Sequence, residues 1–372
     1  MKRLVILLWM GALLQICSAQ TPENLVLDKI DTGRIEGVMY RIIFPPDWNH
    51  NLVMYAHGYE SPQSPVNSLR SVSSRRDMGF KPFLDRGFAV ARSAYSKVGW
   101  ALPEGVDETE ALRKYFFDKY GKPDTTFIVG HSMGGGITVA TAENFSGYYQ
   151  GALPLCPLAG RPYLQIKMAL DMNAVVAAAF PGTMPSLVSV TNGTAPPLDL
   201  TLLRDAISKD TLLAWQIARH FELKMKDLAI VVGWNDGVLR DVSKQAGGNP
   251  IDNSNTLYTG LSNDREINLN VERIEAKSGT EWFLNRYDRT GDISIPTVLL
   301  HTIYDPSIVP SMAIVSIDNL AQQKGKQDNL VMYFTNGQAH CAFSPRETGK
   351  AFDILRKWSS SGKKPISGEL GL

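Results

Sequence analysis

Short runs of β-branched and aromatic residues alternate along this chain with longer segments of helical periodicity. Such runs predict strands at residues 34–44, 52–56, 88–91, 126–129, 152–156, 297–301 and 330–334. Helices between the strands are predicted after residue 107, over 137–142 and over 347–358. Strands that alternate with helices predict an α/β fold, with a mainly parallel sheet and helices on both faces.

The helix after residue 107 has a clear start signal and a clear apolar stripe. Asp107 is predicted to cap it, because Glu110 follows three residues later as in a capping box. The apolar positions at i, i+1, i+4 and i+5 would face the sheet. They are Ala111, Leu112, Tyr115 and Phe116.

The pattern changes between residues 160 and 291. Helical stretches such as 203–223 are interrupted there by turn-forming clusters at 181–182 and 247–250. We therefore predict a largely helical inserted cap over 160–291, between two parts of one α/β core at 20–159 and 292–372. A separate binding domain is the alternative, but it would need strands of its own, and this segment supplies few.

The N-terminus resembles an export signal. Lys2 and Arg3 precede an apolar run at 4–14, and small residues at 17–19 offer a cleavage site before Gln20. We predict a signal peptide over 1–19 and an exported protein, periplasmic or extracellular. A lipid anchor on Cys17 is the rival interpretation, although the usual small residues before such a cysteine are missing. No later stretch reaches the roughly 18 unbroken apolar residues of a membrane span.

Charge narrows the range of partners. The chain carries 38 Lys and Arg against 37 Asp and Glu, so it has no net field that would attract nucleic acid or an anionic membrane. A small, neutral or weakly charged substrate is the better expectation. Nothing in the sequence indicates the oligomeric state.

Residues 130–134 carry the strongest chemical signal. The pentapeptide Gly-His-Ser-Met-Gly lies between the predicted strand at 126–129 and the predicted helix at 137–142. Strand, G-x-S-x-G and helix together describe a nucleophile elbow, in which the serine oxygen is held exposed above the sheet. We predict that Ser132 is a nucleophile; a purely structural turn is the alternative.

A serine hydroxyl needs a base to accept its proton and a carboxylate to orient that base. His340 follows the last predicted core strand, and Asp305 lies in a loop just beyond the strand at 297–301. Ser132, Asp305 and His340 thus occur in the Ser–acid–His order of α/β-hydrolases. Asp236 and Asp292 are weaker alternatives for the acid.

The other histidines fit the role of base less well. His57 lies in the loop expected to shape an oxyanion hole, and the His131 side chain should point away from the serine oxygen. His301 lies inside a strand, and His50 and His220 have no motif around them. No histidine has a second histidine or a cysteine at a spacing that suits a metal, apart from the adjacent His340 and Cys341, whose adjacency is unsuitable for joint ligation. We therefore expect no metal, and we expect no cofactor.

Two backbone amides are expected to bind the negative oxygen of a tetrahedral intermediate. Met133 follows the nucleophile, and Tyr59 follows the His57-Gly58 pair; both amides are predicted donors. Aromatic residues in the loops at the same edge of the sheet are candidates to line a substrate pocket, although each alone is more often ordinary packing. These candidates are Tyr59, Tyr95, Trp100 and Tyr304.

Two cysteines, Cys156 and Cys341, remain after the predicted cleavage. An exported protein can oxidise such a pair to a disulfide. Two buried free thiols are the alternative, because the sequence does not show that the two residues meet.

These motifs together resemble the α/β-hydrolase superfamily. The resemblance lies in Ala56-His57-Gly58, the elbow at 130–135, Asp305 to Pro310 and His340. It covers about 50–160 and 292–360 and leaves the insertion unmatched. Within the superfamily, the chain looks like secreted carboxylesterases and feruloyl esterases, and like the catalytic domain of prolyl-oligopeptidase relatives.

Tannase-type feruloyl esterases join one cysteine beside the serine to another beside the histidine. Cys341 matches the second position, but His131 occupies the first, which leaves Cys156 as a substitute partner.

The sequence-based hypothesis is an exported serine hydrolase that cleaves small-molecule carboxylic esters through an acyl-enzyme. A serine peptidase of the prolyl-oligopeptidase type would use the same residues. A binding protein that kept the fold and lost the chemistry is a third interpretation.

Overall fold

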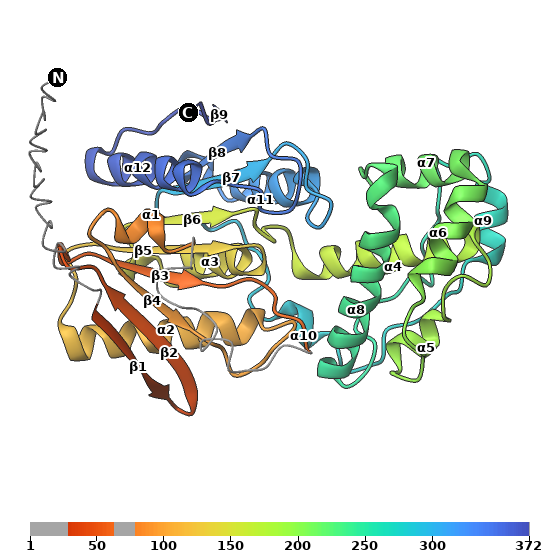
Figure 1. The fold of residues 1–372 in the computed structure, drawn as a ribbon, viewed down its shortest axis with the longest axis horizontal. Coiled ribbons are helices and arrows are strands. Elements are labelled where there is room, and N and C mark those ends of the chain that lie inside the picture. The colour runs from red at the N-terminus through yellow and green to blue at the C-terminus, as the bar shows by residue number, and fades with distance from the viewer. Residues whose placement is uncertain (1–28, 63–78, 372) are drawn as a thin grey trace, which may run out of the picture.

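A single sheet organises the molecule in this computed structural model, which describes residues 29–62 and 79–371. The predicted signal peptide at 1–19 lies outside the described residues. The sheet has nine strands in the order β1-β2-β4-β3-β5-β6-β7-β8-β9 (Figure 1). They are β1 (Lys29–Ile35), β2 (Val38–Phe44), β3 (Leu52–Ala56), β4 (Ala89–Ser93), β5 (Thr126–His131), β6 (Gly151–Leu155), β7 (Thr297–Thr302), β8 (Leu330–Thr335) and β9 (Gly368–Glu369).

Strand direction identifies the fold. β2 runs antiparallel to both β1 and β4, whereas β4, β3 and β5 to β9 pair in parallel. Every residue of β3, β4, β6 and β7 is buried, as expected for strands covered on both faces. The second strand is antiparallel, the strands after it are parallel, and β4 lies between β2 and β3 in the sheet. This arrangement is that of the α/β-hydrolase fold. The predicted fold class is therefore confirmed.

Helices cover both faces of this sheet. On one face, α1 (Lys81–Leu84) and α12 (Pro345–Ser361) pack Phe83, Phe352 and Leu355 against the strands. The other face is covered by α2 (Leu102–Tyr120), α3 (Met133–Asn144) and α11 (Ser316–Gln323). No helix in the described ranges has the length and apolar character needed to cross a bilayer.

Two local predictions in the core are corrected by the structure. The predicted strand at 34–44 is a hairpin, because Glu36 and Gly37 both adopt positive φ and form a tight turn between β1 and β2. Helix α2 begins at Leu102 instead of after Asp107, since a proline in the first turn starts it earlier. Asp107 instead pairs with Arg286 and accepts a hydrogen bond from Tyr287.

Between β6 and β7 the chain forms a helical region, which we call the cap. In Figure 1 most of it lies beside the sheet as a separate group of helices, and its described residues form none of the named strands. Its helices are α4 (Pro162–Ala179), α5 (Leu187–Thr191), α6 (Leu200–Lys209), α7 (Thr211–His220), α8 (Leu228–Ala246), α9 (Asp264–Asn270) and α10 (Trp282–Asn285).

The helix predicted at 203–223 is two helices in the structure. The break comes at Asp210, whose carboxylate accepts a hydrogen bond from the Leu213 amide at 3.0 Å and so caps the start of α7.

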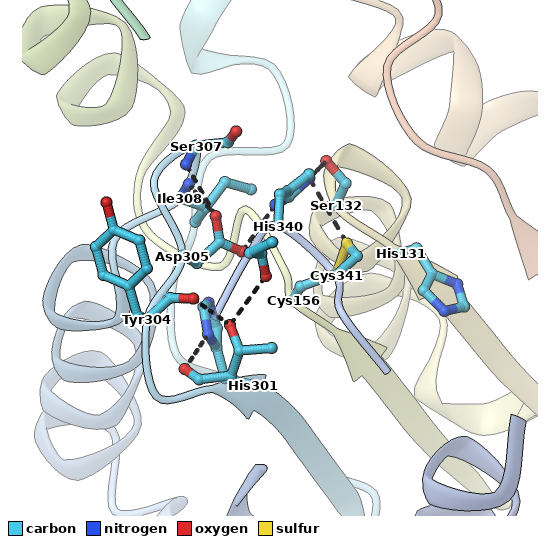
Figure 2. The surroundings of a disulfide bond; sticks show 12 residues. His131, Ser132, Cys156, His301, Tyr304, Asp305, Ser307, Ile308, His340 and Cys341 are labelled. Atoms are coloured by element: carbon cyan, nitrogen blue, oxygen red, sulfur yellow. Dashed lines mark hydrogen bonds and ion pairs between the residues drawn. A yellow bond between two sulfur atoms is a disulfide. The ribbon is translucent and has the colours of Figure 1, made fainter. Parts of the chain in front are cut away.

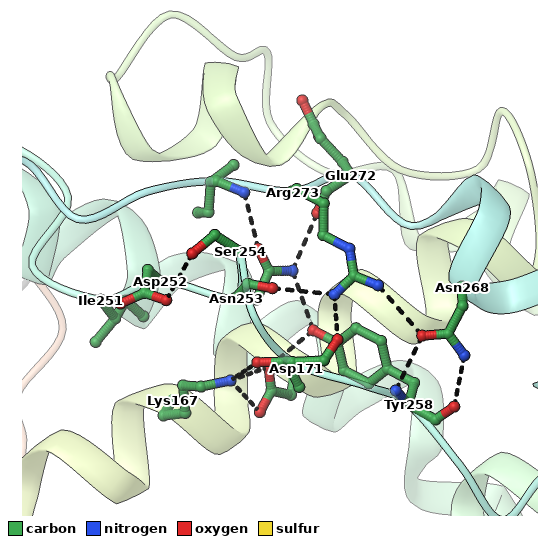
Figure 3. Close-up of polar contacts among 12 residues, drawn as sticks. Lys167, Asp171, Ile251, Asp252, Asn253, Ser254, Tyr258, Asn268, Glu272 and Arg273 are labelled. Carbon is green, nitrogen blue, oxygen red and sulfur yellow. Dashed lines mark hydrogen bonds and ion pairs between the residues drawn. The ribbon is translucent and has the colours of Figure 1, made fainter.

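Polar side chains fix the irregular second half of the cap onto α4 (Figure 3). Asp171 of α4 pairs with Lys167 at 2.6 Å and accepts a hydrogen bond from the Tyr258 hydroxyl at 2.8 Å. Asn253 donates to the Tyr258 oxygen at 3.0 Å, and Arg273 donates to the Asn253 carbonyl at 3.0 Å. Since 249–263 has no helix or strand of its own, this network, together with a few backbone hydrogen bonds, holds the segment in place.

Cys156 and Cys341 form a disulfide in the structure (Figure 2). Cys156 directly follows β6, and Cys341 lies in the loop between β8 and α12, 185 residues further along the chain. The bond therefore joins the point where the chain leaves the sheet for the cap to the loop that carries His340.

Digestion of the purified protein without reductant is expected to release one linked peptide pair containing Cys156 and Cys341. Replacing both cysteines with serine should lower the free energy of unfolding by about 2–5 kcal/mol, because the long loop is no longer closed in the unfolded chain. Non-reducing mass spectrometry and denaturant unfolding measure the two effects. Alkylation of both thiols in unreduced protein would contradict the pairing.

Candidate active site

Ser132 occupies a strained turn between β5 and α3. Its φ of 59° and ψ of −123° lie outside the common regions for a residue with a side chain. The turn requires glycine on both sides: a Cβ on Gly130 would overlap the Gly134 carbonyl, and a Cβ on Gly134 would overlap the Ala56 carbonyl. Strand and helix therefore approach closely, as in the predicted elbow.

His340 and Asp305 meet Ser132 at this edge of the sheet (Figure 2). The Nε2 atom of His340 lies 2.8 Å from Ser132 Oγ, and its Nδ1 atom lies 2.8 Å from Asp305 Oδ2. The three residues follow β5, β7 and β8, whose carboxyl ends lie at one edge because these strands are parallel. The structure thus brings the three predicted residues together.

Asp305 is fully buried and remains an anion. Burial alone would raise the pKa of this carboxyl, but hydrogen bonding and charge from His340, with the Ile308 amide, lower the pKa below its ordinary value. The Oδ1 atom accepts hydrogen bonds from the backbone amides of Ser307 at 2.9 Å and Ile308 at 3.0 Å. One carboxylate oxygen is therefore fixed by the backbone, and the other faces His340.

Three other histidines near this edge make their hydrogen bonds elsewhere than to the serine oxygen; His57 and His301 are buried, and His131 is half-buried. Burial lowers the pKa of His57 to about 3 and that of His131 to about 4, and it also lowers the pKa of His301. The His131 ring turns away from Ser132 in Figure 2. It hydrogen-bonds the Tyr55 hydroxyl at 2.8 Å. These three imidazoles are therefore neutral at ordinary pH.

The weaker candidates are placed elsewhere. Asp236 forms an ion pair with Arg240 at 2.7 Å on α8, and Asp292 lies 3.2 Å from Lys326. His50 stacks on Trp48, and His220 packs against Phe221 in the cap. Neither the two alternative acids nor these two histidines hydrogen-bond with Ser132 or with the Asp305–His340 pair.

The two predicted oxyanion donors lie next to the serine in the chain or in space. Met133 is the first residue of α3, where backbone N–H groups have no partner within the helix. Gly58 packs against the nucleophile turn, since a Cβ at this position would lie 3.3 Å from Ser132 Cβ and 3.2 Å from the His131 carbonyl oxygen. Tyr59 is the next residue in the chain, and it lines the same cavity as Ser132.

A cavity of about 60 Å³ adjoins Ser132 and His340. Its walls come from core and cap and are mostly apolar, with the amide side chains of Gln165 and Asn235 among them. The other lining residues are Tyr59, Trp100, Met133, Leu158, Ile166, Ala169, Trp234, Val238, Ser307 and Ile308. Two of the predicted pocket residues, Tyr59 and Trp100, are in this set.

Tyr95 and Tyr304 are not in it. Tyr95 is 1% exposed and stacks beneath His57 with 3.9 Å between the ring centroids. The Tyr304 hydroxyl donates to Asp227 at 2.6 Å and accepts from the Lys224 amide at 2.9 Å, so it links a core loop to the cap. The predicted pocket roles of these two tyrosines are therefore not supported by where their side chains lie.

Sequence reasoning missed the cap side of the cavity. Trp234, Asn235 and Val238 share one face of α8, and Ile166 and Ala169 share one face of α4. The helical spacing of these residues marks an apolar face, but such a face does not show which cavity it will line.

Cys156, His340 and Cys341 offer three ligand atoms within 4.8 Å of one another, the grouping in the described residues that comes nearest to a metal site. Both sulfurs are joined in the disulfide, so neither can serve as a thiolate ligand. The donor set does not fit a metal while that bond is intact.

Comparison with known proteins assigns no function to this chain. No family model matches the sequence, and no curated protein matches it. Among solved structures, a Mycobacterium smegmatis proline iminopeptidase is 12% identical, with a TM-score of 0.44 over 90% of this chain and 100% of the other. A Bacillus coagulans carboxyl esterase is 15% identical, with a TM-score of 0.43 over 90% of this chain and 97% of the other.

A Pyrococcus horikoshii acylaminoacyl peptidase is 11% identical, with a TM-score of 0.44 over 91% of this chain. This chain spans 42% of the length of that peptidase. At these identities and scores, the likenesses assign no substrate. The chain has the α/β-hydrolase fold, an assignment that rests on its own strand order and on the turn at Ser132.

Proposed function

We propose that this protein is an exported serine hydrolase that cleaves carboxylic esters through an acyl-enzyme. The main support is the unbroken chain of contacts from Asp305 through His340 to Ser132, each 2.8 Å long. The export part of the proposal depends on the signal peptide predicted at 1–19.

In the proposed first step, His340 Nε2 accepts the proton of Ser132 as the serine oxygen attacks the ester carbonyl. His340 then becomes an imidazolium ion beside the buried Asp305 carboxylate, which stabilises the new charge and fixes the ring orientation. The backbone hydrogen bonds to Asp305 keep that carboxylate in place during the transfer.

The carbonyl oxygen becomes negative in the tetrahedral intermediate. The amides of Met133 and Tyr59 are the proposed donors to it, at the start of α3 and next to Gly58. When the intermediate collapses, the carbon–oxygen bond to the alcohol breaks, and His340 returns its proton to the alcohol. A water molecule then attacks the acyl-enzyme while His340 accepts its proton. His340 returns this proton to Ser132 as the bond to the serine oxygen breaks and the acid is released.

The cavity favours a short acyl group. A volume of about 60 Å³ is well below the roughly 300–1,000 Å³ of a typical ligand pocket. Gln165 and Asn235 are the polar side chains that the cap contributes to this mostly apolar space. We therefore propose small esters as the substrate class.

Ser132→Ala is expected to abolish labelling by a fluorophosphonate probe and to reduce ester turnover by about 10³-fold or more, because the attacking oxygen is lost. Gel fluorescence and an assay with p-nitrophenyl acetate measure the two effects. Ser307→Ala, a serine of the same cavity, should still be labelled. Unchanged turnover in Ser132→Ala would refute the assignment.

Asp305→Asn is expected to lower kcat by about 10⁴-fold in the p-nitrophenyl acetate assay, since an amide cannot hold His340 in the reactive tautomer.

Asp305→Asn should also change how the free energy of unfolding depends on pH. The folded-state pKa of Asp305 is lowered, so its stabilisation is present above the unfolded value of 3.8 and is lost as the pH falls below that value. Denaturant unfolding at pH 3 to 7 should give a flatter profile for the variant. An identical profile would contradict the ionised, stabilising carboxylate.

Acetate and butyrate esters are expected to be cleaved with at least about tenfold higher kcat/KM than octanoate esters, because longer chains exceed the cavity. p-Nitrophenyl esters of graded length test this, with matched anilides as amide controls. Ile166→Ala should extend the accepted length by removing a wall of the cavity. Equal rates from acetate to octanoate would rule out the acyl-size limit, and faster anilide cleavage would favour a peptidase.

A further inference from the structure

A buried carboxylate of the cap reaches into the core beside the candidate active site. Asp241 of α8 is 7% exposed, and its Oδ2 accepts hydrogen bonds from the Trp100 amide at 2.7 Å and the Tyr59 hydroxyl at 3.1 Å. Its Oδ1 accepts one from the Gln245 side chain at 2.9 Å. Two of these three neutral donors belong to core loops, so this side chain joins the cap to the core.

A glycine in a core loop leaves room for the Asp241 carboxylate. Gly99 has a φ of +77°, and a Cβ there would overlap the Asp241 carboxylate. The Gly99 amide donates to the Glu60 carbonyl at 2.7 Å, which ties its loop to the loop of Tyr59. A side chain at position 99 would therefore separate Asp241 from the Trp100 amide.

Both core partners of Asp241 line the cavity next to Ser132. Trp100 forms part of its wall, and Tyr59 also packs edge-on against Trp234 of α8, with 5.2 Å between ring centroids. Burial and the neighbouring Asp241 raise the pKa of the Tyr59 phenol, so the hydroxyl stays protonated and remains a donor. The Tyr59 side chain is thus held by two residues of α8, Asp241 and Trp234.

We infer that Asp241 is a positioning residue. It holds two parts of the site in place for the reaction: the cavity wall at Trp100 and the loop around Tyr59, which we call the oxyanion loop because the Tyr59 amide is a proposed oxyanion donor. This inference rests on the proposed function. An oxyanion donor acts only when it is held within a few tenths of an ångström of its place. Removing the carboxylate also leaves the Trp100 amide unpaired in a buried place, which favours a shift of that loop.

The same helix provides a matched control. Asp236 is 5% exposed and pairs with Arg240, which donates to the carbonyls of Ala195 and Pro196 within the cap. Its loss should destabilise the cap without touching Tyr59 or Trp100. A merely structural role for Asp241 predicts equal effects of Asp241→Ala and Asp236→Ala.

The test compares kcat and KM for p-nitrophenyl acetate, with thermal unfolding of each variant. We expect Asp241→Ala to lower kcat about tenfold or more while KM changes less than about threefold, and Asp241→Asn to recover part of the loss. Asp236→Ala should keep kcat within about twofold at a similar loss of Tm. Equal loss of kcat in Asp236→Ala and Asp241→Ala, or an unchanged kcat in the latter, would overturn the inference.

Tyr59→Phe gives a variant that keeps the fold even if Asp241→Ala does not. It removes one donor to Asp241 and leaves the backbone amide in place. We expect a fall in kcat of about threefold or more on its own, and no further loss when it is combined with Asp241→Ala, because that variant has already lost the contact with the Tyr59 hydroxyl. Additive losses would show that the two residues act separately.

Hydrogen exchange separates failure of this inference from failure of the proposed function. The Trp100 amide should exchange at least about tenfold faster in Asp241→Ala than in the wild type, while it stays protected in Asp236→Ala. If the wild type neither reacts with the fluorophosphonate nor cleaves esters, the proposed function fails, whatever the exchange shows. Unchanged exchange at Trp100 would refute the anchoring itself.

Discussion

The close approach of β5 and α3 at Ser132 is the constraint on which the rest of the site depends. Gly130 leaves the space that the Gly134 carbonyl occupies, Gly134 leaves the space that the Ala56 carbonyl occupies, and Ser132 between them takes a positive φ. A strained turn persists only where the surrounding structure holds it. Here the buried parallel strands on either side of β5 supply that support.

Hydrogen-bond partners then distinguish one imidazole from its neighbours. Loss of solvent lowers the pKa of His57, His131 and His301, whereas the His340 ring lies between Ser132 and the ionised Asp305 carboxylate. Asp305 stays charged in a buried place because backbone amides and His340 replace the water that it lost. The imidazole side chains at this edge of the sheet therefore differ in their hydrogen-bond partners according to their surroundings.

The cap completes a site that the core only begins. Helices α4 and α8 provide much of the cavity wall, and Asp241 carries a cap carboxylate onto core loops. The disulfide lies where the chain passes from β6 toward the cap, beside the loop of His340. In the proposed mechanism, the core supplies the reacting residues, and the cap determines both the accepted acyl size and the rigidity of the oxyanion loop.

The sequence by itself determined the features that depend on neighbouring residues. Strand periodicity and the motif at 130–134 predicted the fold, and chain order singled out Ser132, Asp305 and His340. Only the tertiary structure decided that 34–44 is a hairpin, that Tyr95 lies beneath His57, and that the cap lines the cavity. Local periodicity reports which face of an element is buried, whereas side-chain partners depend on packing between residues far apart in the chain.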